Sequence, residues 1–365
     1  MSAPHFHWFL PMRGDSHHYG DRRPRVADRA YIAEVARAAE RNGFESMLVA
    51  TSHASGDTWL TAAAAAAATA RIKFIVAFRT GYSLPTLVAQ QVDSFAALFD
   101  DRIDINIVTG SDVPEQAAYG DPIEKIDKAT RYERSGEFIE VLHKEFAGEP
   151  YDYAGKHYTI RGGGRPTPLR RQPTIFFGGL SAEAADVGAR LTDVQLMYGE
   201  TPEMVREHVD RVGERAARHD RSVSFGIRIQ VISRDTHDEA VAETDRFLGR
   251  LSADQVAAAQ ARLAERASIG QQRVQSLNPG RIDRDALWPA PGVWSGLGLI
   301  GGGGGSTAIV GSHEEVAETI AGYRAAGIEH FIVSGAPLLE EAYNVGENVL
   351  PLFADDRTGM REVVA

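Results

Sequence analysis

The sequence contains no cysteine in 365 residues, so it has no disulfide, no thiolate metal site and no cysteine nucleophile. It is also short of positive charge, because 39 Lys and Arg stand against 50 Asp and Glu, a net charge of −11. Nucleic acids and anionic membranes require a basic face, so we expect neither as a partner. The apolar run 60–70 is mostly alanine and too short to span a bilayer. The first residues lack a signal-peptide pattern, and together these features favour a cytoplasmic protein.

What is present is a regular alternation of strand and helix patterns. Eight short apolar segments predict strands at Phe6–Leu10, Met47–Ala50, Phe74–Phe78, Ile103–Val108, Ile175–Phe177, Val194–Met197, Phe225–Ile232 and His330–Val333. Segments with helical spacing predict helices at Asp28–Asn42, Trp59–Thr69, Leu84–Phe99, Thr130–Phe146, Ala182–Leu191, Pro202–His219, Glu239–Leu251 and Glu314–Gly327. This order favours a closed parallel (β/α)8 TIM barrel over an open sheet, with the whole chain, 1–365, as a single domain.

Two insertions interrupt the alternation, at about 147–173 and 252–311. The first contains Tyr151–Ile160, whose alternation around Ala-Gly predicts a hairpin. The second contains five consecutive glycines, Gly301–Gly305, which have the largest ordering entropy of any residue type. Because this loop lies between the seventh and eighth strands, we expect it to be a mobile lid near the carboxyl ends of the strands.

Several predicted strands end on small polar residues. The clearest case is Ile105–Asp112, which is apolar at its start and ends on Thr109, Gly110, Ser111 and Asp112, with Asn106 among its apolar residues. The strand at 174–177 likewise runs into Gly178-Gly179-Leu180-Ser181. In (β/α)8 barrels the carboxyl ends of the strands build the site, so these residues predict one shared pocket.

The seventh strand carries a charged residue in its middle. Alternation places Arg228 and Gln230 on one face and Ile227, Ile229 and Val231 on the other. A guanidinium directed into a barrel requires an anion or a paired carboxylate. Arg228 therefore has two possible roles, binding an anionic substrate or forming a structural ion pair.

The order of seven segments resembles that of the luciferase-like flavin-dependent monooxygenases, and within them the alkanesulfonate monooxygenases. The segments are Trp8–Pro11, Asn106–Asp112, Arg131–Glu133, Phe177–Gly179, Phe225–Arg228, Gly270–Arg273 and Leu339–Tyr343. The resemblance implies a two-component monooxygenase that uses O2 and reduced FMN (FMNH2), supplied by a separate NAD(P)H-dependent FMN reductase. It also implies a homodimer or homotetramer, and a glycine lid that keeps water from the flavin. In the sulfonate enzymes the reaction cleaves a C–S bond and releases sulfite and an aldehyde.

The resemblance also assigns residues to the cofactor. Asn106 and Thr109 would contact the flavin ring, for which an amide offers both donors and an acceptor. Tyr132, Gly178, Gly179 and Ser181 would hold the FMN phosphate at a helix N-terminus. The structural alternatives are a loop that caps its own backbone and ordinary N-capping by Ser181.

On the substrate side the resemblance implies contacts from Arg13, Tyr198, Arg228 and Gln230, and catalytic positions at Arg228, His53 and Ser55. An exposed loop histidine is the alternative for His53. The sequence departs from the sulfonate pattern at six positions. It has Gln230 for His, Tyr198 for Trp, Ser55 for Cys, Ala336 for Tyr and Arg13 for His, and at Gly301 it lacks the Arg that begins the lid in the pattern.

These departures lie in the substrate pocket, so flavin-dependent oxygenation is better supported than a sulfonate substrate. The alternatives are a ketone, an amine or a sulfone as substrate, a flavin-binding protein that has lost catalysis, and a deazaflavin-dependent enzyme. No catalytic base is identified, because the Tyr and Cys of the pattern are absent.

Scattered loop histidines such as His17 and His18 do not form a closed ligand set, so no metal is expected. The small residues of the helices at 59–69 and 84–99 suggest a subunit interface.

Overall fold

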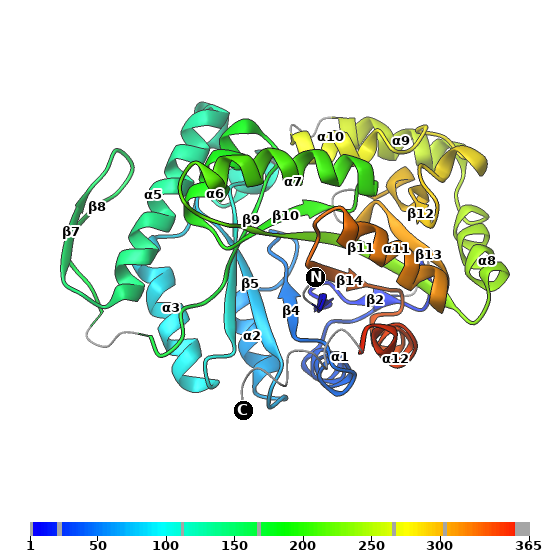
Figure 1. Ribbon diagram of the computed structural model, residues 1–365, viewed down its shortest axis with the longest axis horizontal. Helices are drawn as coiled ribbons and strands as arrows, with labels where there is room; N and C mark the ends of the chain where they lie inside the picture. The colour runs from blue at the N-terminus through cyan, green and yellow to red at the C-terminus, as the bar shows by residue number, and fades with distance from the viewer. Residues whose placement is uncertain are drawn as a thin grey trace.

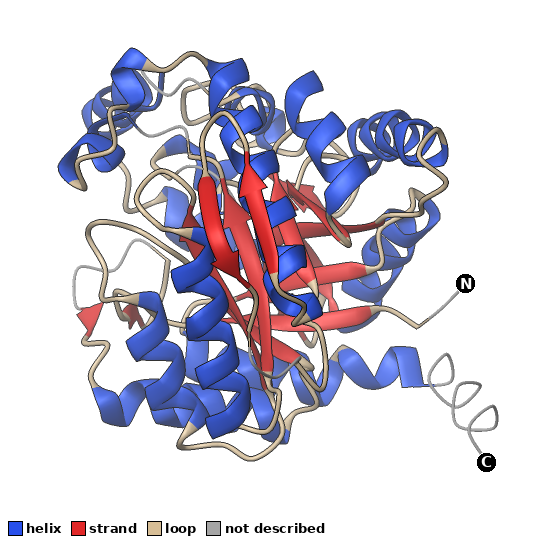
Figure 2. Ribbon diagram, turned by 90° about the vertical axis from the view of Figure 1, so that its left-hand side faces the viewer, coloured by secondary structure: helices blue, strands red, loops and turns tan. Residues whose placement is uncertain are grey.

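Eight parallel strands close into a barrel at the centre of a computed structural model, which describes residues 3–19, 24–110, 113–165, 169–264, 268–301 and 305–354. The strand order is β10-β9-β6-β5-β4-β1-β14-β11, and β11 returns to pair with β10. The barrel strands are β1 His5–Phe9, β4 Ser46–Val49, β5 Lys73–Arg79, β6 Ile103–Val108, β9 Ile175–Gly178, β10 Val194–Tyr198, β11 Ser224–Arg234 and β14 His330–Ser334. Helices surround the strands in Figure 2, and the predicted (β/α)8 fold is confirmed.

The predicted helices are all present, with ends within a few residues of the prediction. They are α1 Arg29–Arg41, α2 Thr58–Ala66, α3 Pro85–Leu98, α5 Lys128–Ala147, α6 Ala182–Leu191, α7 Pro202–Ala217, α8 His237–Leu248 and α11 His313–Ala325. The side chains of Asp28, Asp57 and Asp127 each accept a backbone N–H at a helix start. Pro85 and Pro202 occupy first-turn positions, where a missing N–H costs nothing.

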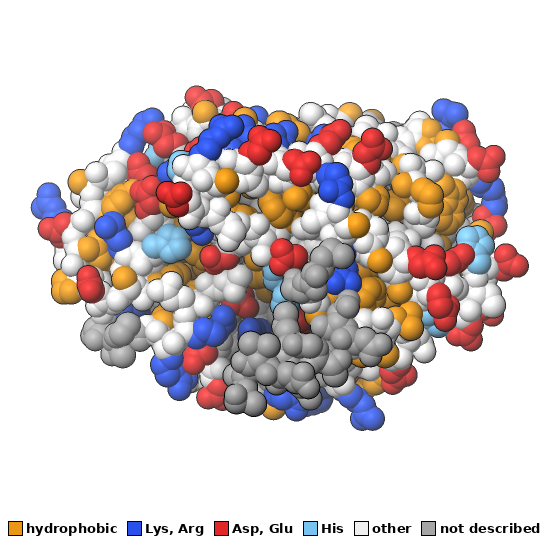
Figure 3. Space-filling view, in the orientation of Figure 1, with side chains coloured by type: hydrophobic (Ala, Val, Ile, Leu, Met, Phe, Trp, Pro, Cys, Tyr) orange, Lys and Arg blue, Asp and Glu red, His pale blue; other side chains and the backbone are white. Residues whose placement is uncertain are grey.

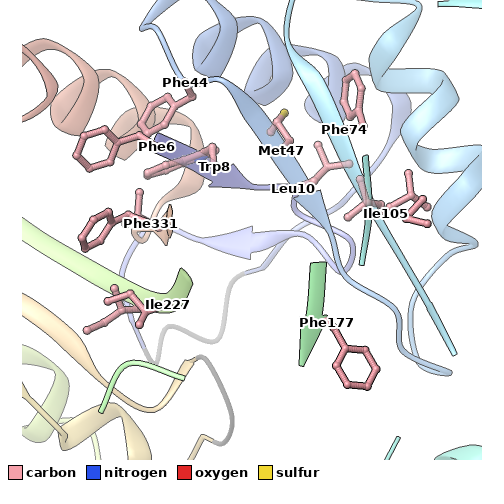
Figure 4. Packing of buried hydrophobic residues seen from close by; sticks show 14 of the residues in the cluster. Phe6, Trp8, Leu10, Phe44, Met47, Phe74, Ile105, Phe177, Ile227 and Phe331 are labelled. Atoms are coloured by element: carbon pink, nitrogen blue, oxygen red, sulfur yellow. The ribbon is translucent and has the colours of Figure 1, made fainter. Parts of the chain in front are cut away.

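Side chains alternate between the two faces of each strand, and this alternation decides what reaches the pocket. Outward-facing residues pack on the outside of the barrel: between ring centroids, Trp8 lies 4.8 Å from Phe44 and Phe6 lies 5.7 Å from Phe331 (Figure 4). Inward-facing residues fill the barrel: Leu48, Ile75, Ala77, Phe176, Val194, Leu196 and Ile332. Even-numbered residues of β6 and β11 share the inward parity, which directs Asn106, Arg228 and Gln230 into the barrel.

The sequence predicted the secondary structure of the first insertion but only part of that of the second. The first forms a hairpin of β7 Tyr151–Ala154 and β8 Thr159–Gly163, as predicted, and projects beyond α5 at one end of the molecule (Figure 1). The second forms α9 Ala253–Ala264, α10 Ile269–Gln275, β12 Val293–Trp294 and β13 Ala308–Ser312. The parallel pairing of β13 with residues 230–234 of β11 was not predicted, because its short apolar run follows the glycines directly.

Some predicted features lie outside the described residues. Residues 302–304 of the glycine lid are among them, and so are Ser111 and Asp112 at the end of the fourth predicted strand. The mobile lid therefore remains a prediction. The further helices α4 Val113–Ala118 and α12 Leu338–Asn348 follow β6 and β14 and were not predicted.

Charged side chains of both signs are interspersed on the face seen in Figure 3, with apolar patches between them. Within the described ranges, no helix is both long enough and apolar enough to cross a bilayer.

Candidate functional site

The guanidinium of Arg228 lies inside the carboxyl-terminal end of the barrel. It donates to the carbonyl oxygen of Ile229 (2.7 Å) and to the Ser334 hydroxyl (2.7 Å), and it stands 4.6 Å from the ring centroid of Phe9. None of the ion pairs formed among the described residues involves Arg228. Burial without a carboxylate lowers the pKa of Arg228 to about 10. The side chain is thus a desolvated cation without an anionic partner among the described residues.

Gln230 lies beside this cation and belongs to the same network. Its amide oxygen accepts hydrogen bonds from the Ser334 hydroxyl and from the Tyr19 hydroxyl, the latter at 3.1 Å. Its amide nitrogen lies beside Gly305, at the edge of the predicted lid. Tyr198 pairs with Arg228 in the β10–β11 register. The structure therefore brings together three of the four predicted substrate residues.

Asn106 points into the barrel from β6, with 8% of its surface exposed. Its side-chain oxygen has no hydrogen-bond partner within the described part of the chain. A buried carbonyl without a donor costs free energy, so such an atom marks a position where a ligand can donate. By contrast, the buried Thr109 hydroxyl lies 3.0 Å from that of Ser135, which donates to a backbone carbonyl of α5. The Thr109 side chain is therefore already engaged within the protein.

The turn between β9 and α6 contains Gly178, Gly179 and Ser181. Gly179 has φ +142°, and a Cβ there would stand 2.7 Å from the Tyr132 hydroxyl. Ser181 is the N-cap of α6 and accepts from the Ala184 N–H at 3.2 Å. Ser181 thus acts as an ordinary N-cap, as the structural alternative predicted. The close approach of the Tyr132 hydroxyl requires glycine at position 179. A first-turn carboxylate, Glu183, is also held at this helix start, so an incoming phosphate would have to displace it or lie beside it.

Three other predicted residues lie away from this cluster. Arg13 is exposed on the loop after β1, and His53 is exposed on the loop after β4. The His53 ring packs edge-on against Tyr119, with 5.0 Å between centroids, and its backbone N–H donates to Glu115. The Ser55 hydroxyl donates to the carbonyl oxygen of Ser52 in its own loop (2.8 Å). Among the described residues, none of these three side chains contacts Arg228 or Asn106.

Sequence reasoning missed two functional candidates at the same end of the barrel, Arg79 and Glu200. The inward-facing Arg79 ends β5 and pairs with Glu115 of α4 (2.7 Å). Glu200, only 2% exposed, pairs with Arg273 of α10 (2.6 Å) and fastens the second insertion over the end of β10. For Arg79 the signal was available, because the alternation that selected Arg228 also places residues 75, 77 and 79 on one face.

Taken together, the described residues define a (β/α)8 barrel whose strand ends carry a cation without a carboxylate partner, an amide oxygen without a donor and a glycine turn at a helix start, each judged within the described part of the chain. The model of the luciferase-like monooxygenase family matches residues 4–330, and the chain belongs to this family. Membership supports an oxidoreductase of the monooxygenase class that works with a flavin. Asn106 and the turn before α6 fit FMN. The Asn106 side-chain oxygen has no donor among the described residues, and a Cβ at Gly178 would meet nothing within 4 Å.

Solved structures agree with the barrel fold. A long-chain alkane monooxygenase (LadA) has a TM-score of 0.77 at 21% identity, over 97% of this chain and 92% of that one. A riboflavin lyase (RcaE) with modified FMN and riboflavin has a TM-score of 0.78 at 18% identity, over 97% and 92%. A coenzyme F420-dependent tetrahydromethanopterin reductase from Methanopyrus kandleri has 0.69 at 18% identity, over 97% and 100%. The same barrel thus serves both flavin and deazaflavin enzymes.

Proposed function

We propose that the protein is a two-component monooxygenase that receives reduced FMN from a separate NAD(P)H-dependent FMN reductase and oxidises a small acidic substrate with O2. The observation that carries the substrate class is Arg228, a buried cation whose described partners are all neutral oxygens and an aromatic face. An anionic substrate group would supply the missing negative charge, and desolvation strengthens that pairing. The proposal places both components in the cytoplasm.

The cofactor would lie across the mouth between β6 and α6. Asn106 would accept from the flavin ring, with Thr109 beside it. Tyr132, Gly178, Gly179 and Ser181 would surround the phosphate at the start of α6. Bound reduced FMN would supply the activation of O2, and the protein would orient the substrate and exclude water.

Alkanesulfonates are the first substrates to test, since a sulfonate oxygen can accept from Arg228 and from the Gln230 amide. Tyr198 would line the pocket, and Arg13 could add a second cation if its loop closes inward. His53 and Ser55 stay candidate catalytic residues on the loop after β4. Loop closure would have to bring both side chains inward, because His53 is exposed and Ser55 donates to its own loop.

The test is substrate-dependent O2 uptake with photoreduced FMN and a panel of alkanesulfonates, alkyl carboxylates, ketones, amines and sulfones. Sulfite release with a sulfonate would support the full proposal. Uptake stimulated only by neutral substrates would remove the role of Arg228. Tight flavin binding without any stimulated uptake would favour a flavin-binding protein that has lost catalysis, and hydride transfer with coenzyme F420 would favour a deazaflavin enzyme.

For the oligomer we propose an interface formed by α2 and α3. Their outer surfaces expose Leu60 (75%) and Leu98 (74%), which flank a largely apolar groove of about 290 Å³. Exposed leucines of this size are typical of interaction surfaces. Leu60→Glu should convert an assembly to monomer in size-exclusion chromatography with light scattering, whereas Leu352→Glu, elsewhere on the surface, should not. A wild-type protein that is already a monomer would contradict the interface.

A further inference from the structure

Two buried polar atoms on neighbouring strands lack partners within the described residues: Nε–H of Arg79, a donor, and Oδ1 of Asn106, an acceptor. Both residues are 8% exposed. An unsatisfied buried donor or acceptor costs about 1–3 kcal/mol, so a donor and an acceptor left together on neighbouring strands indicate a ligand that supplies both.

The sheet register places these two side chains on one inward face. Ala77 pairs with Asn106 and Arg79 pairs with Val108 in the β5–β6 ladder. Ala77 belongs to the cluster that fills the barrel, so Arg79, two residues further along β5, has the same inward parity. Arg79 is therefore the diagonal neighbour of Asn106, one step closer to the carboxyl end of the barrel.

Within the described residues, α4 holds the guanidinium of Arg79 through one carboxylate. Its Nη2 donates to Glu115 of α4 at 2.7 Å, and the other carboxylate oxygen of Glu115 accepts the backbone N–H of His53 at 2.8 Å. These bonds fix α4 and the loop after β4 around Arg79. They orient the guanidinium and leave its Nε–H for a different partner.

We propose that Arg79 and Asn106 together recognise the pyrimidine edge of the flavin, and that Arg79 favours the reduced over the oxidised form. This inference rests on the proposed flavin function. The pyrimidine ring of a flavin presents an N3–H donor between two carbonyl acceptors, which complements one acceptor and one donor on adjacent strands. Reduced flavin loses its N1 proton near neutral pH and spreads a negative charge over N1 and the C2 carbonyl. A guanidinium at that edge stabilises the anion and has less effect on the neutral oxidised ring.

A purely structural role for Arg79, fixing α4 through Glu115, makes a different prediction. Loss of that role would lower the stability of the fold and weaken both forms of FMN alike. The ratio of the two dissociation constants, oxidised over reduced, separates the two roles, because it changes only when a side chain distinguishes the redox states.

The experiment measures this ratio with the full chain, by tryptophan fluorescence titration with oxidised FMN in air and with photoreduced FMN under anaerobic conditions. Arg79→Met should lower the ratio at least tenfold, mainly through weaker binding of reduced FMN. Arg79→Lys keeps the charge without the Nε donor and should give an intermediate ratio. Arg102→Met is the matched control, since Arg102 is equally buried (7%) but donates to backbone carbonyls at the opposite end of the barrel.

Glu115→Gln provides a second test if Arg79→Met does not fold. This variant should raise the ratio, because it removes a negative charge beside the guanidinium. A ratio unchanged by both Arg79 and Glu115 substitutions, or lowered equally by Arg102→Met, would overturn the inference. If wild-type protein binds neither form of FMN, the proposed function itself fails. If it binds reduced FMN with a ratio indifferent to Arg79, only this inference fails.

Discussion

Arg228→Met removes the buried cation while it keeps an unbranched side chain of similar length. In the wild-type protein an anionic ligand would gain at least one charge-assisted hydrogen bond from the guanidinium, worth about 1.5–3 kcal/mol. We therefore expect octanesulfonate and octanoate to bind roughly 10-fold to 150-fold more weakly to the variant. Octanol, which carries no charge, should lose less than about threefold. Equilibrium titration in the presence of FMN measures all three.

The stability of the same variant tests whether Arg228 is a structural residue instead. The substitution deletes hydrogen bonds to Ile229 and Ser334, at about 0.5–1.5 kcal/mol each, but it also relieves a desolvated charge. These effects oppose each other, so the free energy of unfolding in urea should change by less than about 2 kcal/mol. Arg234→Met, on the same strand, is the control. It leaves the buried Glu341 carboxylate without its cation and should destabilise by about 2 kcal/mol or more, with a smaller loss of sulfonate binding than Arg228→Met, because the charge of Arg234 is already paired.

The two variants should thus show opposite patterns. If Arg228→Met destabilises the fold by more than about 3 kcal/mol and leaves octanesulfonate binding unchanged, Arg228 is structural and the reasoning on substrate class is wrong.

Three further predictions concern the scaffold. Burial lowers the pKa of His330 to about 3, so the folded state requires its neutral form. The contribution of neutral His330 to the free energy of unfolding is therefore complete above pH 6.5 and is lost as the pH falls toward 3. Urea unfolding should show roughly 2 kcal/mol lost by pH 4.5, and His330→Gln should flatten this slope. Gly179→Ala should lower the free energy of unfolding by about 1–3 kcal/mol and weaken FMN binding, since its Cβ would meet the Tyr132 hydroxyl. Adding Tyr132→Phe should not fully restore the stability, because the φ of +142° at residue 179 remains strained. Arg273→Met leaves Glu200 buried and unpaired and should cost about 3–5 kcal/mol, most of which Glu200→Gln should recover in the double variant.

The sequence was sufficient for the barrel because each strand is a short apolar run bounded by polar or glycine residues. It also predicted that Arg228 points into the barrel, because strand alternation places it opposite Ile227 and Ile229, whereas its role stays a prediction. It failed at β13, where Ala308–Ser312 is too short to stand out beside a run of five glycines. It also failed at α12, whose Leu338–Asn348 pattern follows the eighth strand without a side-chain cap.

The composition of the pocket depends on contacts far apart in the chain. Ser334 lies 106 residues after Arg228, and the two meet only because β14 and β11 are neighbours. Arg79 and Glu115 meet because α4 folds back over the end of β5, and the six-residue α4 carries no strong signal of its own. The neighbours that the fold supplies decide which polar side chains of a strand remain available to a ligand. The Thr109 hydroxyl bonds to Ser135, whereas the Asn106 oxygen has no partner among the described residues.

The most direct test of the account is an anaerobic titration of the full chain with photoreduced FMN, beside parallel titrations with oxidised FMN and with reduced coenzyme F420. The account predicts that reduced FMN binds at least tenfold more tightly than either of the others, and that mixing the complex with O2 and an acidic substrate consumes oxygen. Tight binding of F420 without binding of reduced FMN would contradict it.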